Sequence, residues 1–143
     1  MPSPSAIIDV VGGPNVVGAM VSSQFDLIRM VRAGLPVTTI HALVQSGRLS
    51  RSETDRVVLP RKTLAHRERI GTLTADQSDR LLRVARVLAA AEEVFGDQDT
   101  AHAWLRRATT ALRGEVPLDL LDTEEGAREV EILLGRIAHG IAA

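Results

Sequence analysis

The chain has 143 residues, 45% of them hydrophobic and 24% charged, a composition typical of one globular domain or two small ones. It contains no cysteine, which excludes disulfides, thiolate nucleophiles and zinc sites with cysteine ligands, and this is typical of a reducing cytoplasm. For the chain taken as a whole, the formal net charge of −1 argues against a nucleic-acid-binding protein, because such proteins are usually basic.

The first 22 residues contain the most apolar stretch of the chain, residues 6–21, which read AIIDVVGGPNVVGAMV. This stretch is shorter than the roughly 20 apolar residues of a membrane-spanning helix, so no membrane partner is expected. A secretory signal would require a positively charged segment before the apolar stretch, but no lysine or arginine precedes residue 6. Valine and isoleucine runs on either side of Gly-Gly-Pro-Asn predict a short β-arm over residues 1–22, with a disordered segment as the alternative.

Beyond this arm, the hydrophobic spacing predicts an all-α fold. Helix-ending glycines and one proline separate the predicted helices, at Gly34, Gly47, Pro60 and Gly96. The predicted helices span residues 25–31, 36–46, 50–58, 61–69, 74–95, 98–112 and 123–141.

Two helix starts carry the capping-box pattern, in which a Ser or Thr is followed three residues later by Glu or Gln. Ser50 with Glu53 predicts one start, and Thr74 with Gln77 predicts the start of the longest helix. Apolar residues on the long helix recur at helical spacing and predict a stripe that faces the core. This stripe comprises Val84, Leu88, Ala91 and Phe95.

The near-neutral total charge hides two oppositely charged halves. Residues 1–72 contain nine Lys or Arg and five Asp or Glu, whereas residues 73–143 contain eight and thirteen. Such an asymmetry suggests two different partners. The sequence is accordingly divided into an N-terminal arm, a basic domain and an acidic domain, at residues 1–22, 23–72 and 73–143.

The basic charge is concentrated around two short predicted helices joined by a tight break at Pro60, the length and order of a helix-turn-helix. In that motif the second helix enters the major groove, and arginine can bind guanine edges or phosphates there. The alternative is an ordinary solvated helix face. The candidate DNA-binding residues are Arg51, Arg61, Lys62, Thr63, His66 and Arg67.

Catalysis finds little support in the sequence. The four histidines are scattered without metal-ligand spacing, and no Gly-Lys-Ser/Thr phosphate loop occurs. Because no nucleophile, base and orienting group come together, we expect a protein that is not an enzyme and needs neither metal nor cofactor.

The C-terminal stretch contains RVLAAAEEVFGD, AHAWLRRATTALRGEVPLDLL and DTEEGAREVEILLGRIAHG. These motifs resemble the toxin-binding domain of the Xre/MbcA/ParS antitoxins, which partner RES-domain toxins in type II toxin–antitoxin pairs. Gly34-Leu35-Pro36 and Arg61-Lys62-Thr63-Leu64 resemble the Xre-type (Xre/Cro-like) DNA-binding half. The resemblance covers residues 23–141. Val58-Leu59-Pro60 departs from it, because the turn is one residue shorter than in many members.

The resemblance implies an antitoxin that blocks the active site of an NAD-consuming RES toxin and represses its own operon as a homodimer or in a higher-order complex. The acidic half could complement a basic cleft. For several of the candidate toxin-binding residues, among them Trp104, His139 and Ile141, a core or frayed position is the alternative. The candidates are Trp104, Glu131, Arg136, His139, Gly140 and Ile141.

Two other functions remain open. One is a DNA-binding transcriptional regulator without a toxin. The other is a protein–protein adaptor that has lost DNA binding because of its shortened turn. All three interpretations place the protein in the cytoplasm.

Overall fold

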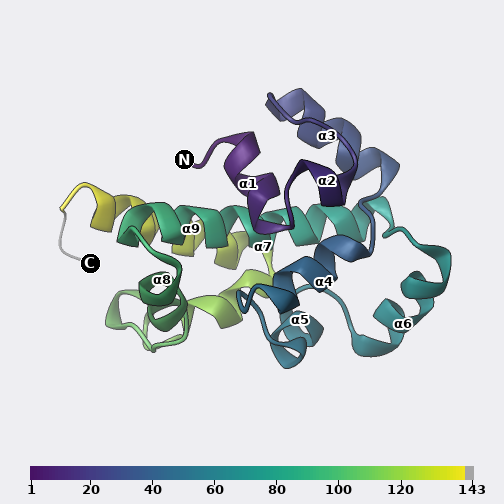
Figure 1. Cartoon of the computed structure of the whole chain (residues 1–143). Helices are drawn as coiled ribbons and strands as arrows, with labels where there is room; N and C mark the ends of the chain where they lie inside the picture. The colour runs from purple at the N-terminus through teal and green to yellow at the C-terminus, as the bar shows by residue number, and fades with distance from the viewer. Residues whose placement is uncertain (141–143) are drawn as a thin grey trace.

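The computed structural model describes residues 1–140, which form nine α-helices and two 3-10 helices (Figure 1). In the described residues, β-structure is limited to two isolated bridges, Pro36 with Thr72 and Thr109 with Glu115. The predicted all-α fold is therefore confirmed. The elements are α1 (Pro4–Val10), α2 (Pro14–Val17), α3 (Gln24–Ala33), α4 (Thr38–Gln45), α5 (Arg51–Val57), α6 (Arg61–Ile70), α7 (Ala75–Phe95), α8 (Gln98–Leu105), η1 (Thr110–Leu112), η2 (Pro117–Asp122) and α9 (Glu124–Ala138).

Both predicted capping boxes are present. The Ser50 hydroxyl accepts from the Glu53 N–H at the start of α5, while the Glu53 carboxylate accepts from the Ser50 N–H. Thr74 and Gln77 make the same reciprocal pair at the start of α7. These pairs satisfy backbone donors that a helix start leaves without partners, so local sequence defines where both helices begin.

The β-arm prediction is wrong, because residues 4–17 form α1 and α2. Ser3 caps α1 and Pro4 occupies its first turn, where a missing N–H costs nothing. Gly12 and Gly13 have φ angles of 110° and 82° and make the turn between the two helices. The apolar residues belong to the core: Ile8 and Val11 are buried and α1 packs against α7.

The predicted helix over residues 98–112 is also interrupted. α8 ends at Leu105, and residues 106–115 fold back as a loop whose ends meet at the Thr109–Glu115 bridge. Leu112 is still buried, but it reaches the core from η1. At the C-terminus, α9 ends at Ala138, and Ile141 lies outside the described residues.

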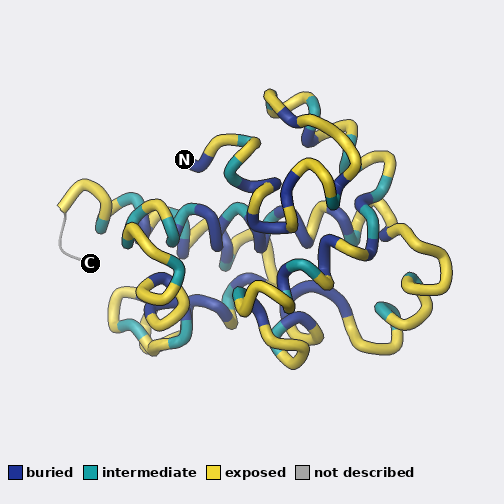
Figure 2. Tube along the Cα trace, viewed as in Figure 1, coloured by how far each residue is buried: buried dark blue, intermediate teal, exposed yellow. Residues whose placement is uncertain are grey.

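α7 is the centre of the molecule, with α1, α3, α8 and α9 packed around it (Figure 1). On its predicted core stripe, Val84, Leu88 and Ala91 are buried and Phe95 is half-buried. The dark-blue trace in Figure 2 runs along α7 and continues into α9 and the N-terminal helices, so the described residues share one core. Its side chains are almost all aliphatic, as the composition predicts.

Candidate functional site

α5 and α6 form the predicted helix-turn-helix with a tight turn between them. Val58 and Leu59 in the turn are buried. The Asp55 carboxylate accepts from the Arg61 N–H at 2.6 Å, and Arg80 on α7 donates to the Val58 carbonyl at 3.2 Å. The shortened turn is therefore held by its own hydrogen bonds and by the core, with α6 projecting from it.

α6 is the only helix of the described part of the chain with no buried residue (Figure 2). Leu64 packs its half-buried side chain against the core. The other anchors are polar: His41 Nε2 lies 3.0 Å from Glu68 Oε2, and Arg67 Nε donates to the Thr72 carbonyl at 2.8 Å. A cleft of about 620 Å³ separates α6 from α4 and α5. The helix thus presents most of its surface to solvent.

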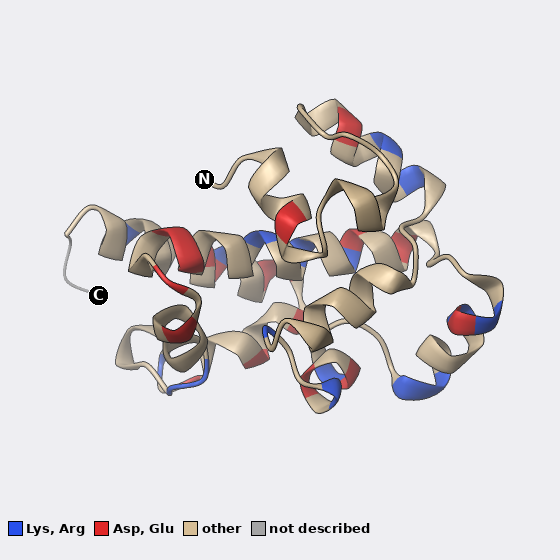
Figure 3. Ribbon diagram, viewed as in Figure 1, with Lys and Arg blue, Asp and Glu red and all other residues tan. Residues whose placement is uncertain are grey.

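Four of the six candidate DNA-binding side chains are exposed. The exposed residues Arg61, Lys62 and His66 lie on α6, and exposed Arg51 is the first residue of α5. The remaining two are half-buried Thr63 and Arg67. The first turn of α6 therefore carries two exposed cations, at the position from which a recognition helix contacts DNA; Figure 3 marks basic positions there in blue.

The candidate toxin-binding residues do not all lie on one surface. Trp104 is only 7% exposed, and its ring lies 5.4 Å from that of Phe95, centroid to centroid. The indole of Trp104 therefore packs in the core against half-buried Phe95, and little of it is exposed to a partner.

Glu131 is likewise engaged inside the protein. Arg86 on α7 makes a two-pronged contact with it, Nε to Oε2 at 3.0 Å and the terminal nitrogen to Oε1 at 2.9 Å. The same guanidinium reaches Glu124 at 3.3 Å. Burial alone would lower the pKa of Arg86, but the two carboxylates outweigh burial and raise it. This cluster joins α7 to α9.

The exposed candidates gather at the end of α9. Arg136, His139 and Gly140 are exposed, and Gly140 follows the helix with a φ of 71°. His139 and the half-buried Glu131 both line a hollow of about 410 Å³ here, to which Met1 and Pro2 also contribute. No sign of this N-terminal contribution is present in the sequence, because no local pattern indicates that residue 1 lies close to the C-terminal end of α9.

Long-range ion pairs connect the helix-turn-helix to the C-terminal elements. Arg106, directly after α8, donates to both carboxylate oxygens of Glu53 at 2.8 Å and to the Arg48 carbonyl at 2.9 Å. Arg48 in turn binds Glu92 on α7 at 2.7 Å. Burial alone would raise the pKa of Glu53, but Arg106 and the Ser50 N–H hold it below the usual value. No local sequence pattern predicts these pairs.

No group of three or more potential metal ligands occurs among residues 1–140. In the same residues no helix has the length and hydropathy required to span a bilayer.

The comparisons with known proteins match this architecture. A model of the "Antitoxin Xre-like helix-turn-helix domain" matches residues 26–86, and a model of the "Antitoxin Xre/MbcA/ParS C-terminal toxin-binding domain" matches residues 90–140. The chain thus combines a helix-turn-helix domain with a toxin-binding domain.

Similar proteins place it more closely. "Antitoxin Xre" of Pseudomonas putida is 37% identical over 120 residues, covering 83% of this chain and 75% of the relative. "Antitoxin Xre" of Photorhabdus laumondii is 35% identical over 130 residues, covering 89% and 88%. "Prs ADP-ribosylating antitoxin" of a Sphingobium species is 32% identical over 80 residues, half of each chain. This chain belongs to the Xre antitoxin family.

Proposed function

We propose that this antitoxin neutralises a RES-domain toxin by covering its NAD-binding active site with the end of α9, and represses its own operon through α5 and α6. Operator DNA, the toxin and a second copy of the chain are its proposed partners, and the cytoplasm its location. The protein acts by binding alone, with no reaction of its own.

The separation of the two exposed surfaces carries the proposal. α6 lies beyond the N-terminal end of α7, and the end of α9 lies near its C-terminal end (Figure 1). α7 has 21 residues and is therefore about 30 Å long. The two proposed partners thus have separate binding surfaces at opposite ends of α7.

Two features support inhibition by occlusion. Arg136 and His139 are exposed at the end of α9, and His139 lines a hollow that can receive part of a partner. The name of the Sphingobium relative associates an antitoxin with ADP-ribosylation, a chemistry that consumes NAD. A NAD-binding cleft that is basic would also complement the acidic C-terminal half electrostatically.

Toxin neutralisation is tested by co-expressing the chain with the product of the neighbouring gene and by measuring NAD consumption with purified proteins. The double variant Arg136→Ala and His139→Ala is expected to inhibit more weakly than wild type, with unchanged operator binding. Arg128→Ala, an exposed arginine near the start of the same helix, is the matched control. Growth arrest that wild type does not relieve would identify a regulator without a toxin instead.

Repression is tested by measuring operator affinity against salt concentration. Arg61 and Lys62 are exposed in the first turn of α6, so replacing both with alanine removes cations aimed at DNA without disturbing the core. The variant is expected to bind weakly and with a shallower salt dependence. Two-fold operators match two-fold proteins, so we expect a homodimer on DNA. An absence of salt-dependent operator binding by wild type would rule out the repressor role.

A further inference from the structure

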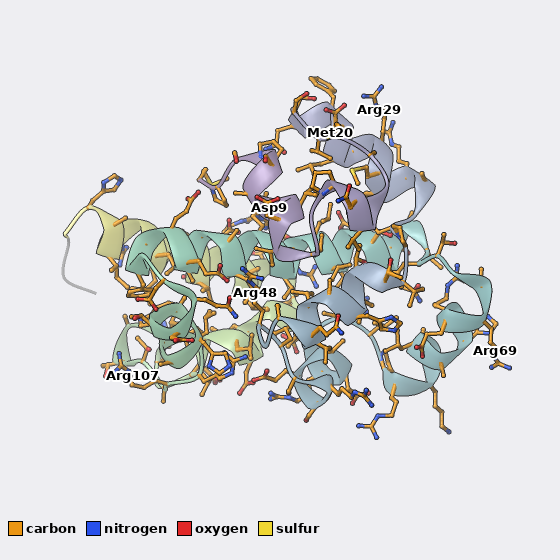
Figure 4. The ribbon with its side chains drawn as sticks, in the orientation of Figure 1. Asp9, Met20, Arg29, Arg48, Arg69 and Arg107 are labelled. Atoms are coloured by element: carbon orange, nitrogen blue, oxygen red, sulfur yellow. The ribbon has the colours of Figure 1, made fainter. Side chains whose placement is uncertain are left out.

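The loop after α8, residues 106–115 (the basic loop), carries cations that the proposed function does not use. Arg107 and Arg113 are both exposed, and in the described part of the chain neither has a carboxylate within ion-pair distance. Figure 4 shows Arg107 on the outer side of this loop, pointing away from the protein. Glu115 at the end of the loop is the loop's only acidic residue, and its carbonyl accepts from the Thr109 N–H.

Arg113 is held in an unusual backbone conformation. Its φ of 59° makes it the one non-glycine residue with positive φ among residues 1–140. Glycine would adopt this conformation at no steric cost, whereas a side chain there costs about 1 kcal/mol or more. Strained, exposed and charged, this residue suggests a contact with a partner.

The loop is fixed beside the helix-turn-helix. Arg106, its first residue, is the one that binds Glu53 and the Arg48 carbonyl next to the start of α5. A second pair, Arg56 with Asp119 at 2.7 Å, joins α5 to η2 beyond the loop. In a helix-turn-helix the first helix crosses the phosphate backbone. The basic loop therefore lies next to the element that meets phosphates.

Figure 3 shows basic positions at the start of α6, on α5 and in the basic loop along the lower edge of the view, with acidic positions also present on α5. α3, which carries Arg29 and Arg32, lies at the upper edge, and the end of α9 lies to the left. The cations of the basic loop thus lie on the same side of the molecule as those at the start of α6.

We propose that Arg107 and Arg113 bind DNA phosphates flanking the half-site that α6 reads, so that the DNA-binding surface extends onto the domain matched as toxin-binding. This inference rests on the proposed operator binding. Arg106 is the positioning residue, since it ties the loop to α5. The contacts are to phosphates and carry no sequence information, so they add affinity for any duplex.

The test uses the full chain with Arg107→Gln and Arg113→Gly, because glycine suits the backbone of residue 113. Operator and unrelated duplexes are titrated over a range of salt concentrations. The double variant is expected to lose affinity for both duplexes by the same factor, and the slope of log affinity against log salt falls by about 0.9 for each phosphate that the variant no longer binds. Restoring the charge with Arg113→Lys on the Arg107→Gln background should recover part of the slope.

Arg32→Gln on α3, another exposed arginine without an ion-pair partner in the described residues, is the control and should leave the slope unchanged. A wild-type slope in the double variant would overturn the inference while leaving operator binding by α6 intact. Loss of toxin neutralisation with a wild-type slope would also overturn it and assign the loop to the toxin. If wild type itself binds no operator, the proposed repressor role fails first.

Discussion

α6 and α7 follow one another in the chain, yet they are stabilised in opposite ways. α7 buries nine of its 21 residues, whereas α6 buries none of its ten. Burial of aliphatic side chains therefore holds α7 in place, while α6 depends on Leu64, on the Asp55 cap and on the contacts of His41 and Arg67. The helix proposed to enter the DNA groove thus keeps most of its surface exposed, and the helix between the two proposed binding surfaces forms the core.

The sharpest test of this contrast truncates one leucine in each helix. Leu81 on α7 is fully buried, so Leu81→Ala is expected to lower the free energy of unfolding by about 2–5 kcal/mol. Leu64 on α6 is half-buried, and Leu64→Ala is expected to cost about 1 kcal/mol. Urea denaturation followed by circular dichroism measures both. Equal losses would show that α6 belongs to the core as fully as α7 does.

A second test compares two glycines within the packed body, both on α9. A Cβ at Gly126 would lie 1.9 Å from the Leu120 carbonyl oxygen, so Gly126→Ala must displace backbone and is expected to cost about 3 kcal/mol. Gly135 has no atom within 4 Å of such a Cβ, and Gly135→Ala is expected to stabilise by about 0.5–1 kcal/mol. Thermal denaturation should move in opposite directions for the two variants; a similar shift for both would contradict the tight contact at Gly126.

The connection between the helix-turn-helix and the C-terminal elements is tested at Arg106. Its pair with Glu53 is largely buried, and Arg106→Ala is expected to cost about 2 kcal/mol. A double-mutant cycle with Glu53→Gln isolates the pair, because glutamine can still accept the Ser50 N–H. Arg56→Ala is the control: that pair is 49% and 42% exposed, and its removal should cost under about 1 kcal/mol. Additive losses at Arg106 and Glu53 would mean that the connection does not stabilise the fold.

The smallest effect is the pH dependence of that connection. The pKa of Glu53 is lower in the folded protein than its ordinary value of 4.5, so the ionised carboxylate stabilises the fold above pH 4.5. This contribution is lost as the pH falls through the lowered pKa. The stability difference between wild type and Glu53→Gln, about 1 kcal/mol at neutral pH, should therefore shrink only below pH 4.5. Denaturation series at several pH values measure it, and a difference independent of pH would exclude the charge as its source.

Much of the fold could be predicted because its signals are local. Ser50 with Glu53, Thr74 with Gln77 and the apolar stripe of α7 depend on residues within a few turns of one another, and each was confirmed. Exposed Arg61 and Lys62 follow from the same reasoning, since charge and helix position place them on a surface.

What local pattern could not provide was the partner of each segment. Residues 6–17 are apolar enough for a strand or a helix. In the structure they are largely helical, and α1 packs against α7. Trp104 could have lain in an interface or in the core, and the neighbouring Phe95 places it in the core. Arg106 and Glu53 are 53 residues apart, so no periodicity could pair them.

Helix positions, caps and the charge of each segment followed from neighbouring residues, because hydrogen bonds at helix ends and the 3.6-residue period act over short stretches of chain. Burial, ion pairing and the placement of the two exposed ends were decided by tertiary packing. The physical reason is that desolvation and charge pairing depend on which distant segments meet, and in this protein they meet around α7.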